Sequence, residues 1–365
     1  MTTFKRALFI ILGLFFPIFL GTCLFWLDFT HTSMIHAKEG VKYNVAPGAT
    51  YKTISTDLYK QHLISHSLLF NILVRLDGNI HKLKAGEYLF PYGATPLHVL
   101  NQIMTGTGLI YHTFTIIPGS TFAQMRLVLN NNAELKHTSM NLSDAELMKR
   151  LGSSYTNPEG LFFPDTYYFV LGTPDLTLLK NAYHAMQTKL NAAWQHRAPN
   201  LPFKTSYEVL IAASIIEKET GLNEERPIIA GVLENRLRLN MLLQFDPTVI
   251  YGLGSRYTGK IYLTNLRENN PYNTYVVKGL PPTPISMPSL ISINAVTQPD
   301  NNDYLYFVAK GYGSGHQFSR TLSQHNAAVS VSRVHLAGNF NVELIQKYLI
   351  KTFRKEYPIA RVPMK

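Results

Sequence analysis

Residues 205–221 read TSYEVLIAASIIEKETG, and this stretch decides the fold. Thr205 followed three residues later by Glu208 is a capping-box signature, which predicts a helix starting here. The apolar residues between 209 and 216 surround that helix almost completely, so we expect it to be buried. Gly221 marks its C-terminal end. A second helix should follow directly, capped by Asn223 with acidic residues in its first turn.

Two glutamates stand near the end of the first of these helices. Glu217 and Glu219 are two residues apart, about 200° around the helix, so they point to opposite faces and are judged separately. Apolar neighbours and the negative end of the helix dipole both favour the neutral acid, so we expect a raised pKa. A protonated glutamic acid can serve as a general acid for a glycosidic oxygen. The alternative is a surface glutamate paired with Lys218 or Arg226.

The sequence after these helices carries polar groups suited to sugars. Residues 241–252 read MLLQFDPTVIYG, and a proline-rich stretch follows at 279–285. A strand at 304–309 runs into glycines at 311–315, where no Lys-Ser/Thr pair follows, so we expect a hairpin loop and not a phosphate cradle. The zinc helix His-Glu-x-x-His and the Gly-x-Ser-x-Gly elbow are both missing. Amides, tyrosines and carboxylates remain, which is sugar-binding chemistry.

Before residue 205 the chain predicts a small mixed unit and the beginning of a larger one. Strands are expected at 41–45 and 84–90, and helices at 53–60, 67–76 and 95–104. A further strand at 111–118 and helices at 122–129 and 144–151 open the larger unit. His62 and His66 are spaced like metal ligands but lack a third ligand, so a solvated helix face is the better interpretation. Residues 159–167, EGLFFPDTY, are either a cleft wall or a core strand with a turn.

The N-terminus predicts a membrane anchor. Residues 7–27 contain no charge, and about 20 apolar residues suffice to cross a bilayer. Lys5 and Arg6 precede the run, so the positive-inside rule leaves the N-terminus in the cytoplasm and the rest outside. A cleaved signal peptide or a lipoprotein site at Cys23 are the competing interpretations. The net charge of +11 favours anionic partners, but export argues against nucleic acid.

Several motifs resemble one family, the YceG-like (MltG) endolytic murein transglycosylases of the bacterial inner membrane. They are EGLFFPDTY at 159–167, ASIIEKET at 213–220, ENRL at 234–237, QFDPTV at 244–249, YNTY at 272–275, GLPP at 279–282 and GHQF at 315–318. The resemblance implies an anchor at 1–29, a linker at 30–40, a LysM-like glycan-binding module at 41–108, an α+β catalytic domain at 109–345 and a basic tail at 346–365. The catalytic domain would be periplasmic.

The resemblance also implies an activity, which is cleavage within peptidoglycan glycan strands to leave 1,6-anhydro-N-acetylmuramic ends. Its catalytic glutamate falls on Glu217, which would act first as acid and then as base. Five residues are expected to orient the sugar: Gln244, Asp246, Asn273, Tyr275 and His316. Glu219 is expected to be structural and to tie the helix end to Arg226 or Arg236. Phe245 departs from the family pattern, which usually has a small polar residue there.

No metal or cofactor is implied, and the expected partners are glycan strands, the inner membrane through residues 7–27, and peptidoglycan synthases. Two other functions stay open. One is a muramidase-type hydrolase that uses Asp246 or Asp165 as a second carboxylate. The other is a wall-binding scaffold without catalysis.

Overall fold

The computed structural model describes residues 3–78, 82–311 and 315–337, apart from the side chains of residues 3–12, 14 and 333–337. The fold is a mixed α+β one, as predicted. It divides into two compact units: residues 1–116, 123–156 and 165–182 form the first, and residues 117–122, 157–164 and 183–365 form the second. The predicted basic tail at 346–365 and the end of the predicted catalytic domain lie outside the described residues.

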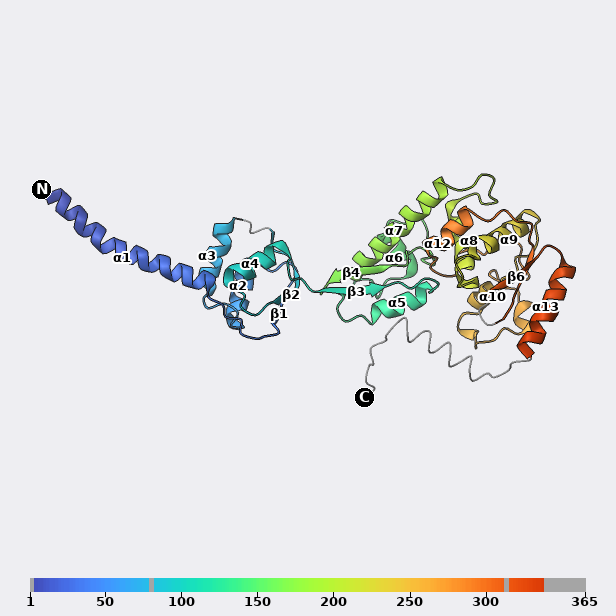
Figure 1. Ribbon diagram of the computed structural model, residues 1–365, viewed down its shortest axis with the longest axis horizontal. Helices are drawn as coiled ribbons and strands as arrows, with labels where there is room; N and C mark the ends of the chain where they lie inside the picture. The colour runs from blue at the N-terminus through green and yellow to red at the C-terminus, as the bar shows by residue number, and fades with distance from the viewer. Residues whose placement is uncertain (1–2, 79–81, 312–314, 338–365) are drawn as a thin grey trace. The chain divides into compact units, whose positions relative to one another are not determined.

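A small two-stranded module occupies part of the first unit. Strand β1 (Val41–Val45) pairs antiparallel with β2 (Gly86–Phe90), and helices α2 (Tyr51–Lys60), α3 (Ser67–Asp77) and α4 (Pro96–Thr105) accompany them. The elements follow the predicted order of strand, two helices, strand and helix (Figure 1). Its core includes the fully buried side chains of Leu58, Phe70, Tyr88 and Ile103. In α3 the spacing of Leu68, Ile72 and Leu76 predicted the wrong face, because these side chains are exposed and Phe70, Leu73 and Val74 are buried.

Helix α1 (Thr3–His31) precedes the module. Phe29 is buried in the module core, whereas Phe15, Phe19 and Leu24 are among the strongly exposed apolar side chains. The predicted span at 7–27 begins in residues whose side chains lie outside the described set. Within the described part of the chain, no helix combines the length and apolar character needed to cross a bilayer.

The remainder of the first unit contains a second antiparallel pair, β3 (Tyr111–Thr115) with β4 (Thr166–Val170). Between the two strands the chain forms helices α5 (Phe122–Asn130) and α6 (Asp144–Arg150). Helix α7 (Asp175–Gln195) follows β4, and its residues after 182 belong to the second unit. The Ser143 side chain caps α6 by accepting from the Glu146 backbone N–H.

The second unit is built around α8 (Ser206–Glu219), which packs against α9 (Arg226–Arg238), α10 (Asp246–Leu253) and α12 (Leu290–Thr297). Every residue of α8 from 209 to 216 is buried, as the apolar pattern predicted, and the Thr205 side chain accepts from the Glu208 backbone N–H. Two short elements, a 3-10 turn (Gly254–Arg256) and α11 (Leu263–Leu266), follow α10.

The predicted end of α8 was within one residue, whereas the predicted N-cap of α9 was wrong by two residues. Helix α8 ends with Thr220 as its C-cap, and α9 begins at Arg226 with Glu225 as its N-cap residue. Asn223 therefore does not cap α9. Pro227 fits the first turn of a helix, because a backbone N–H in that turn has no hydrogen-bond partner within the helix. Helix α9 therefore starts after the acidic residues that were expected to form its first turn.

A hairpin and one helix complete the second unit. Strand β5 (Tyr306–Ala309) pairs antiparallel with β6 (His316–Ser319), and α13 (Leu322–Ala337) packs on both strands (Figure 1). The expected hairpin is therefore present, although its connection at 312–314 lies outside the described residues.

Residues 159–164 of the string at 159–167 are buried, whereas Asp165 and Thr166 are exposed. The buried Glu159 carboxylate accepts from the Phe122 backbone N–H at 2.9 Å and from the Tyr251 hydroxyl at 3.1 Å. Gly160 has φ +75°, and a Cβ there would overlap the Pro284 ring. Leu161 and Phe162 follow, both fully buried. Of the two interpretations left open by the sequence, this supports the core turn.

Candidate active site

One cavity of about 510 Å³ gathers most of the predicted site residues. It lies where the C-terminal ends of α8 and α9, the start of α10, the loop at Tyr275 and the β5–β6 hairpin with α13 meet. Its lining consists of Glu219, Arg236, Gln244, Asp246, Tyr275, Tyr306, Phe307, Val308, Ala309, His316, Leu322, His325 and Asn326. The predicted residues Gln244, Asp246, Tyr275 and His316 are all present. Glu217 and Asn273 are not.

Glu219 supplies a neutral carboxyl group to this cavity. Within the described part of the chain, its Oε2 atom is buried and has no hydrogen-bond partner. Burial, and next the negative charge of Asp246, raise the pKa of Glu219 to about 8, while the positive charge of Arg236 opposes them. A carboxyl with that pKa is mostly protonated at neutral pH, and it can therefore donate a proton.

Arg236 is a fixed positive charge beside Glu219. Its Nε donates to the Leu305 carbonyl at 2.6 Å, and its Nη1 donates to the Leu243 carbonyl, also at 2.6 Å. The guanidinium lies 5.4 Å from the centre of the Tyr306 ring. These contacts, none of which is to a carboxylate, hold the guanidinium in place. Its positive charge therefore faces the groups that line the cavity.

Glu217 lies in a different environment, and the raised pKa predicted for it is wrong. Arg226 donates to both carboxylate oxygens, at 2.9 and 3.2 Å. The Ser289 backbone N–H (2.9 Å), the Ser289 hydroxyl (2.5 Å) and the Ser292 hydroxyl (2.8 Å) also donate to Oε2. Burial raises the pKa of Glu217, but these hydrogen bonds and the Arg226 charge outweigh it and hold the pKa below its usual range.

The two glutamates therefore differ in their partners. Glu217 forms the ion pair that ties the end of α8 to Arg226, while Glu219 faces the cavity with its acid proton retained. The helical spacing correctly separated them by face. It could not identify which face is lined with donors, because Ser289 and Ser292 come from the start of α12, 72 and 75 residues later in the chain.

Asp246 and Gln244 present oxygen and amide groups at the cavity edge. The Tyr275 hydroxyl donates to Asp246 Oδ1 at 2.6 Å, which orients the carboxylate. Burial, followed by the hydrogen bond to Asp246, raises the pKa of Tyr275, so its hydroxyl stays protonated as the donor. Gln244 has the uncommon φ of +53° and is exposed, and its Oε1 accepts from Arg236 Nη1 at 3.5 Å.

Asn273 is not a cavity residue but holds a loop together. Its side-chain amide donates to the carbonyls of Asn265, Leu266 and Glu268 at 3.1, 3.2 and 2.8 Å, and its oxygen accepts from the Tyr275 backbone N–H at 3.0 Å. The buried Asn273 thereby fixes the backbone position of Tyr275. Phe245 is also buried, with its ring 5.8 Å from that of Phe307, and it packs under the cavity instead of lining it.

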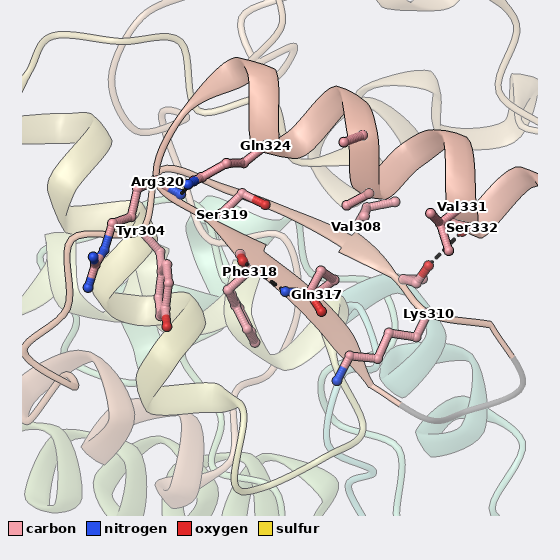
Figure 2. Close-up of a pocket in the computed structure, with 13 residues that line it drawn as sticks. Tyr304, Val308, Lys310, Gln317, Phe318, Ser319, Arg320, Gln324, Val331 and Ser332 are labelled. Atoms are coloured by element: carbon pink, nitrogen blue, oxygen red, sulfur yellow. Dashed lines mark hydrogen bonds between the residues drawn. The ribbon is translucent and has the colours of Figure 1, made fainter.

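A second, larger hollow of about 810 Å³ lies along the β5–β6 hairpin and α13. Figure 2 shows Tyr304, Phe318, Lys310 and Arg320 around it. Its lining contains no carboxylate, so it offers no proton donor of the kind that Glu219 provides. Within the described residues, no three His, Cys, Asp or Glu side chains are grouped as a metal site.

The fold and the cavity define an α+β protein with a buried carboxylic-acid site lined by amide, hydroxyl and aromatic groups. The chain belongs to the YceG-like family, whose model matches residues 43–331. The endolytic murein transglycosylase of Bacillus subtilis (strain 168) is 30% identical over 310 residues, covering 80% of this chain and 84% of that protein.

Two further relatives are similar at lower identity. The endolytic murein transglycosylase of Streptococcus pneumoniae serotype 2 (strain D39) is 28% identical over 312 residues, which cover 75% of this chain but 55% of the relative, so the chain spans about half the length of that protein. A crystal structure of a YceG-like protein from Listeria monocytogenes aligns with a TM-score of 0.49 and 27% identity over 80% of this chain and 99% of the other.

Proposed function

We propose that this protein is a lytic transglycosylase that cleaves the glycosidic bond between N-acetylmuramic acid and N-acetylglucosamine within peptidoglycan strands. Family membership and the names of the relatives support the reaction class. The observation that carries the proposal is the Glu219 carboxyl, unpaired in a cavity of the size needed for a sugar ring, with its pKa raised to about 8.

Glu219 is the general acid in this proposal, in place of Glu217. A hydrolase normally uses two carboxyl groups that flank the bond, whereas a lytic transglycosylase can act with one acid, because the sugar's own 6-hydroxyl replaces water. Glu219 donates its proton to the leaving oxygen, and the N-acetyl group of the muramic residue stabilises the cationic carbon. The product then carries a 1,6-anhydro end. Gln244 and Asp246 offer hydrogen bonds to sugar hydroxyls at the cavity edge.

The proposal extends to where the enzyme acts. Residues 7–27 would anchor it in the plasma membrane with the catalytic part outside the cytoplasm, and the module at 41–108 would bind glycan as a LysM-like domain. The charge-free run and the exposed apolar side chains of Phe15, Phe19 and Leu24 support the anchor. Deleting residues 1–28 should move the protein from the membrane fraction to the soluble fraction. Persistence in the membrane fraction would reject the anchor.

Paired variants test the acid assignment. We expect Glu219→Gln to lose digestion of purified sacculi by about 100-fold or more, since a general acid contributes roughly that much. Glu217→Gln, once corrected for the fraction of folded protein, should keep measurable digestion. Mass spectrometry of the wild-type products should find ends lighter by one water than reducing ends. Reducing ends would instead indicate a muramidase, and unchanged digestion by Glu219→Gln would remove the acid assignment.

A further inference from the structure

The larger hollow, of about 810 Å³, lies directly beside the candidate active-site cavity and has no role in the proposed bond cleavage. Val308 and Ala309 of β5 line both recesses. Strand β6 also contributes to both, with His316 in the lining of the cavity and Gln317 in that of the hollow. A glycan strand that occupies the cavity therefore has a second recess next to it that can receive a side branch.

The hollow has a positive charge at each end. Lys310 lies at the loop end of the hairpin, and Arg320 lies at the opposite end (Figure 2). Among the described residues, the exposed Lys310 side chain has no ion-pair partner. Arg320 has a loose contact with Asp303, 3.9 Å from Nε to Oδ2, in which both side chains are largely exposed. The lining itself contains no carboxylate, so it favours an anionic ligand.

The distance between the two charges matches a short extended peptide. The Leu305 N–H donates to the Ser319 carbonyl at 3.0 Å, and the Lys310 N–H donates to the Gly315 carbonyl at 2.9 Å, so both ends of the hollow are fixed on the paired strands. From residue 305 to residue 310, at about 3.4 Å per residue, the strand covers about 17 Å. An extended peptide of about five residues spans at most a similar length.

Between the charged ends the lining is apolar, and its side chains are short. Helix α13 contributes Ala327, Ala328 and Val331, and β5 contributes Val308. Short side chains on the helix leave the space above the hairpin unfilled, as Figure 2 shows for the region between α13 and the strands. Surfaces of this kind fit methyl groups, which are the side chains of alanine residues.

Hydrogen bonds hold the helix on the hairpin at both ends of the hollow. The Ser332 hydroxyl donates to the Ala309 carbonyl at 2.8 Å. Near the start of α13, Gln324 Oε1 accepts from the backbone N–H groups of Arg320 and Thr321, at 3.0 and 3.2 Å. The recess is therefore formed before any ligand binds, which lowers the entropic cost of binding.

We propose that this hollow binds the peptide stem that N-acetylmuramic acid carries on its lactyl group, while the glycan strand occupies the neighbouring cavity. The inference rests on the proposed transglycosylase function and specifies its substrate class as peptide-bearing strands. The carboxylates of the stem pair with Lys310 and Arg320, and its alanine methyl groups pack on the short side chains of α13. A glycan strand without peptides makes neither contact.

Kinetics of the full-length protein on two matched substrates test the proposal. One substrate is uncrosslinked glycan strands with their stems, and the other is the same strands after an amidase has removed the stems. We expect wild-type protein to have a kcat/KM about tenfold higher on the stem-bearing strands, because an exposed ion pair contributes at most roughly fivefold and two contribute together. Added salt should reduce this preference, since exposed charges are screened.

Reversal of both charges locates the contact. Lys310→Glu combined with Arg320→Glu should reduce the preference to less than about twofold and leave kcat/KM on stripped strands unchanged within about twofold, since only the stem contacts are lost. Lys260→Glu combined with Arg267→Glu makes the same charge change at exposed residues outside both recesses and should keep the preference. Ala328→Leu fills part of the hollow without a charge change and should also reduce the preference. Because the preference is a ratio within one protein sample, partial unfolding of a variant does not alter it.

The outcomes separate this inference from the proposed function. A wild-type protein that cleaves both substrates equally well would overturn the stem site and leave the transglycosylase assignment intact. The same conclusion would follow if the Lys310→Glu and Arg320→Glu variant kept the full preference. A wild-type protein that cleaves neither substrate would reject the proposed function and this inference with it.

Discussion

Arg226 and Glu217 form a two-pronged ion pair that joins the first turn of α9 to the last turn of α8, with Nη1–Oε2 and Nη2–Oε1 distances of 2.9 and 3.2 Å. The Glu217 carboxylate also accepts from the backbone N–H and hydroxyl of Ser289, the N-cap residue of α12. A negative charge at a helix N-terminus is favourable, so one carboxylate stabilises the junction of three helices.

Loss of the Glu217 charge should therefore destabilise the second unit. We expect Glu217→Gln to lower the free energy of unfolding by about 3 kcal/mol, because removal of one partner leaves the buried Arg226 charge uncompensated. Urea denaturation measures this change. Glu224→Gln removes an exposed carboxylate of the same region and should change stability by less than about 0.5 kcal/mol. Equal effects of the two substitutions would show that the ion pair contributes little.

The pH dependence of the Glu217 contribution has a defined sign. Its pKa is lowered in the folded protein, so the stabilisation is present above the unfolded value of 4.5 and is lost as pH falls through the folded pKa. Wild-type protein should lose more stability than Glu217→Gln when pH is lowered from 5 to 3. Parallel unfolding curves for the two proteins over this range would contradict the low pKa.

Glu219 should show the opposite pH dependence. Its pKa rises from 4.5 to about 8 on folding, so the folded state binds the proton more tightly. The contribution is fully present below pH 4.5 and is lost as pH rises through about 8. The free energy of unfolding should therefore fall between pH 5 and pH 8 in the wild type, and fall less in Glu219→Gln.

Glu234 provides the matched control for that measurement. Burial raises the pKa of Glu234 to about 7, against the opposing charge of Arg238, so its contribution has the same sign. Glu234 does not line the cavity. Glu234→Gln should reduce the slope of stability against pH but leave the basic limit of activity near pH 8, which we assign to Glu219. A shift of that limit in Glu234→Gln would contradict the assignment.

The packing of the 159–167 turn can be tested at Gly160. Gly160→Ala meets two costs, a positive φ that alanine disfavours and a Cβ placed 2.7 Å from Pro284 Cγ. We expect the loss of stability to exceed that of Gly172→Ala by about 1–3 kcal/mol, the usual effect of overpacking. Gly172 has φ +79°, and a Cβ added there would have no neighbouring atom within 4 Å, so Gly172→Ala carries the backbone cost alone. Equal losses in thermal unfolding would show that the Pro284 contact can relax.

Local signals in the sequence predicted many of the helices and strands, but helices α7, α12 and α13 were not predicted. The cap at Thr205, the buried pattern after it, and the strands and helices between residues 41 and 105 all follow from spacing and capping within a few residues. Three residues predicted to contact the sugar, Gln244, Asp246 and His316, lie together in the lining of one cavity.

Contacts between residues far apart in the sequence determine the environments of the glutamates, which local sequence signals could not predict. Glu217 and Glu219 share a helix end and a similar sequence environment, but their pKa values move in opposite directions. Burial raises both, and next Asp246 raises that of Glu219 further, whereas the hydrogen bonds from Ser289 and the charge of Arg226 outweigh burial at Glu217. Glu225 looked like an acidic residue of a first helical turn, but its partner is His316, 91 positions later. Neither contact has a local sequence signature.

Substitutions at Asn273 and Gln244 distinguish residues that maintain the structure of the site from residues that contact the substrate. Asn273→Ala removes the donor for three carbonyls, so we expect a loss of about 1–3 kcal/mol in unfolding free energy. Asn273→Asp keeps the acceptor for the Tyr275 N–H but places a carboxylate against those carbonyls, and it should be at least as unstable. Gln244→Ala, in contrast, should leave stability nearly unchanged and raise KM, because its exposed amide lies at the cavity edge. A raised KM in folded Asn273→Ala with no loss of stability would instead place Asn273 in contact with the sugar.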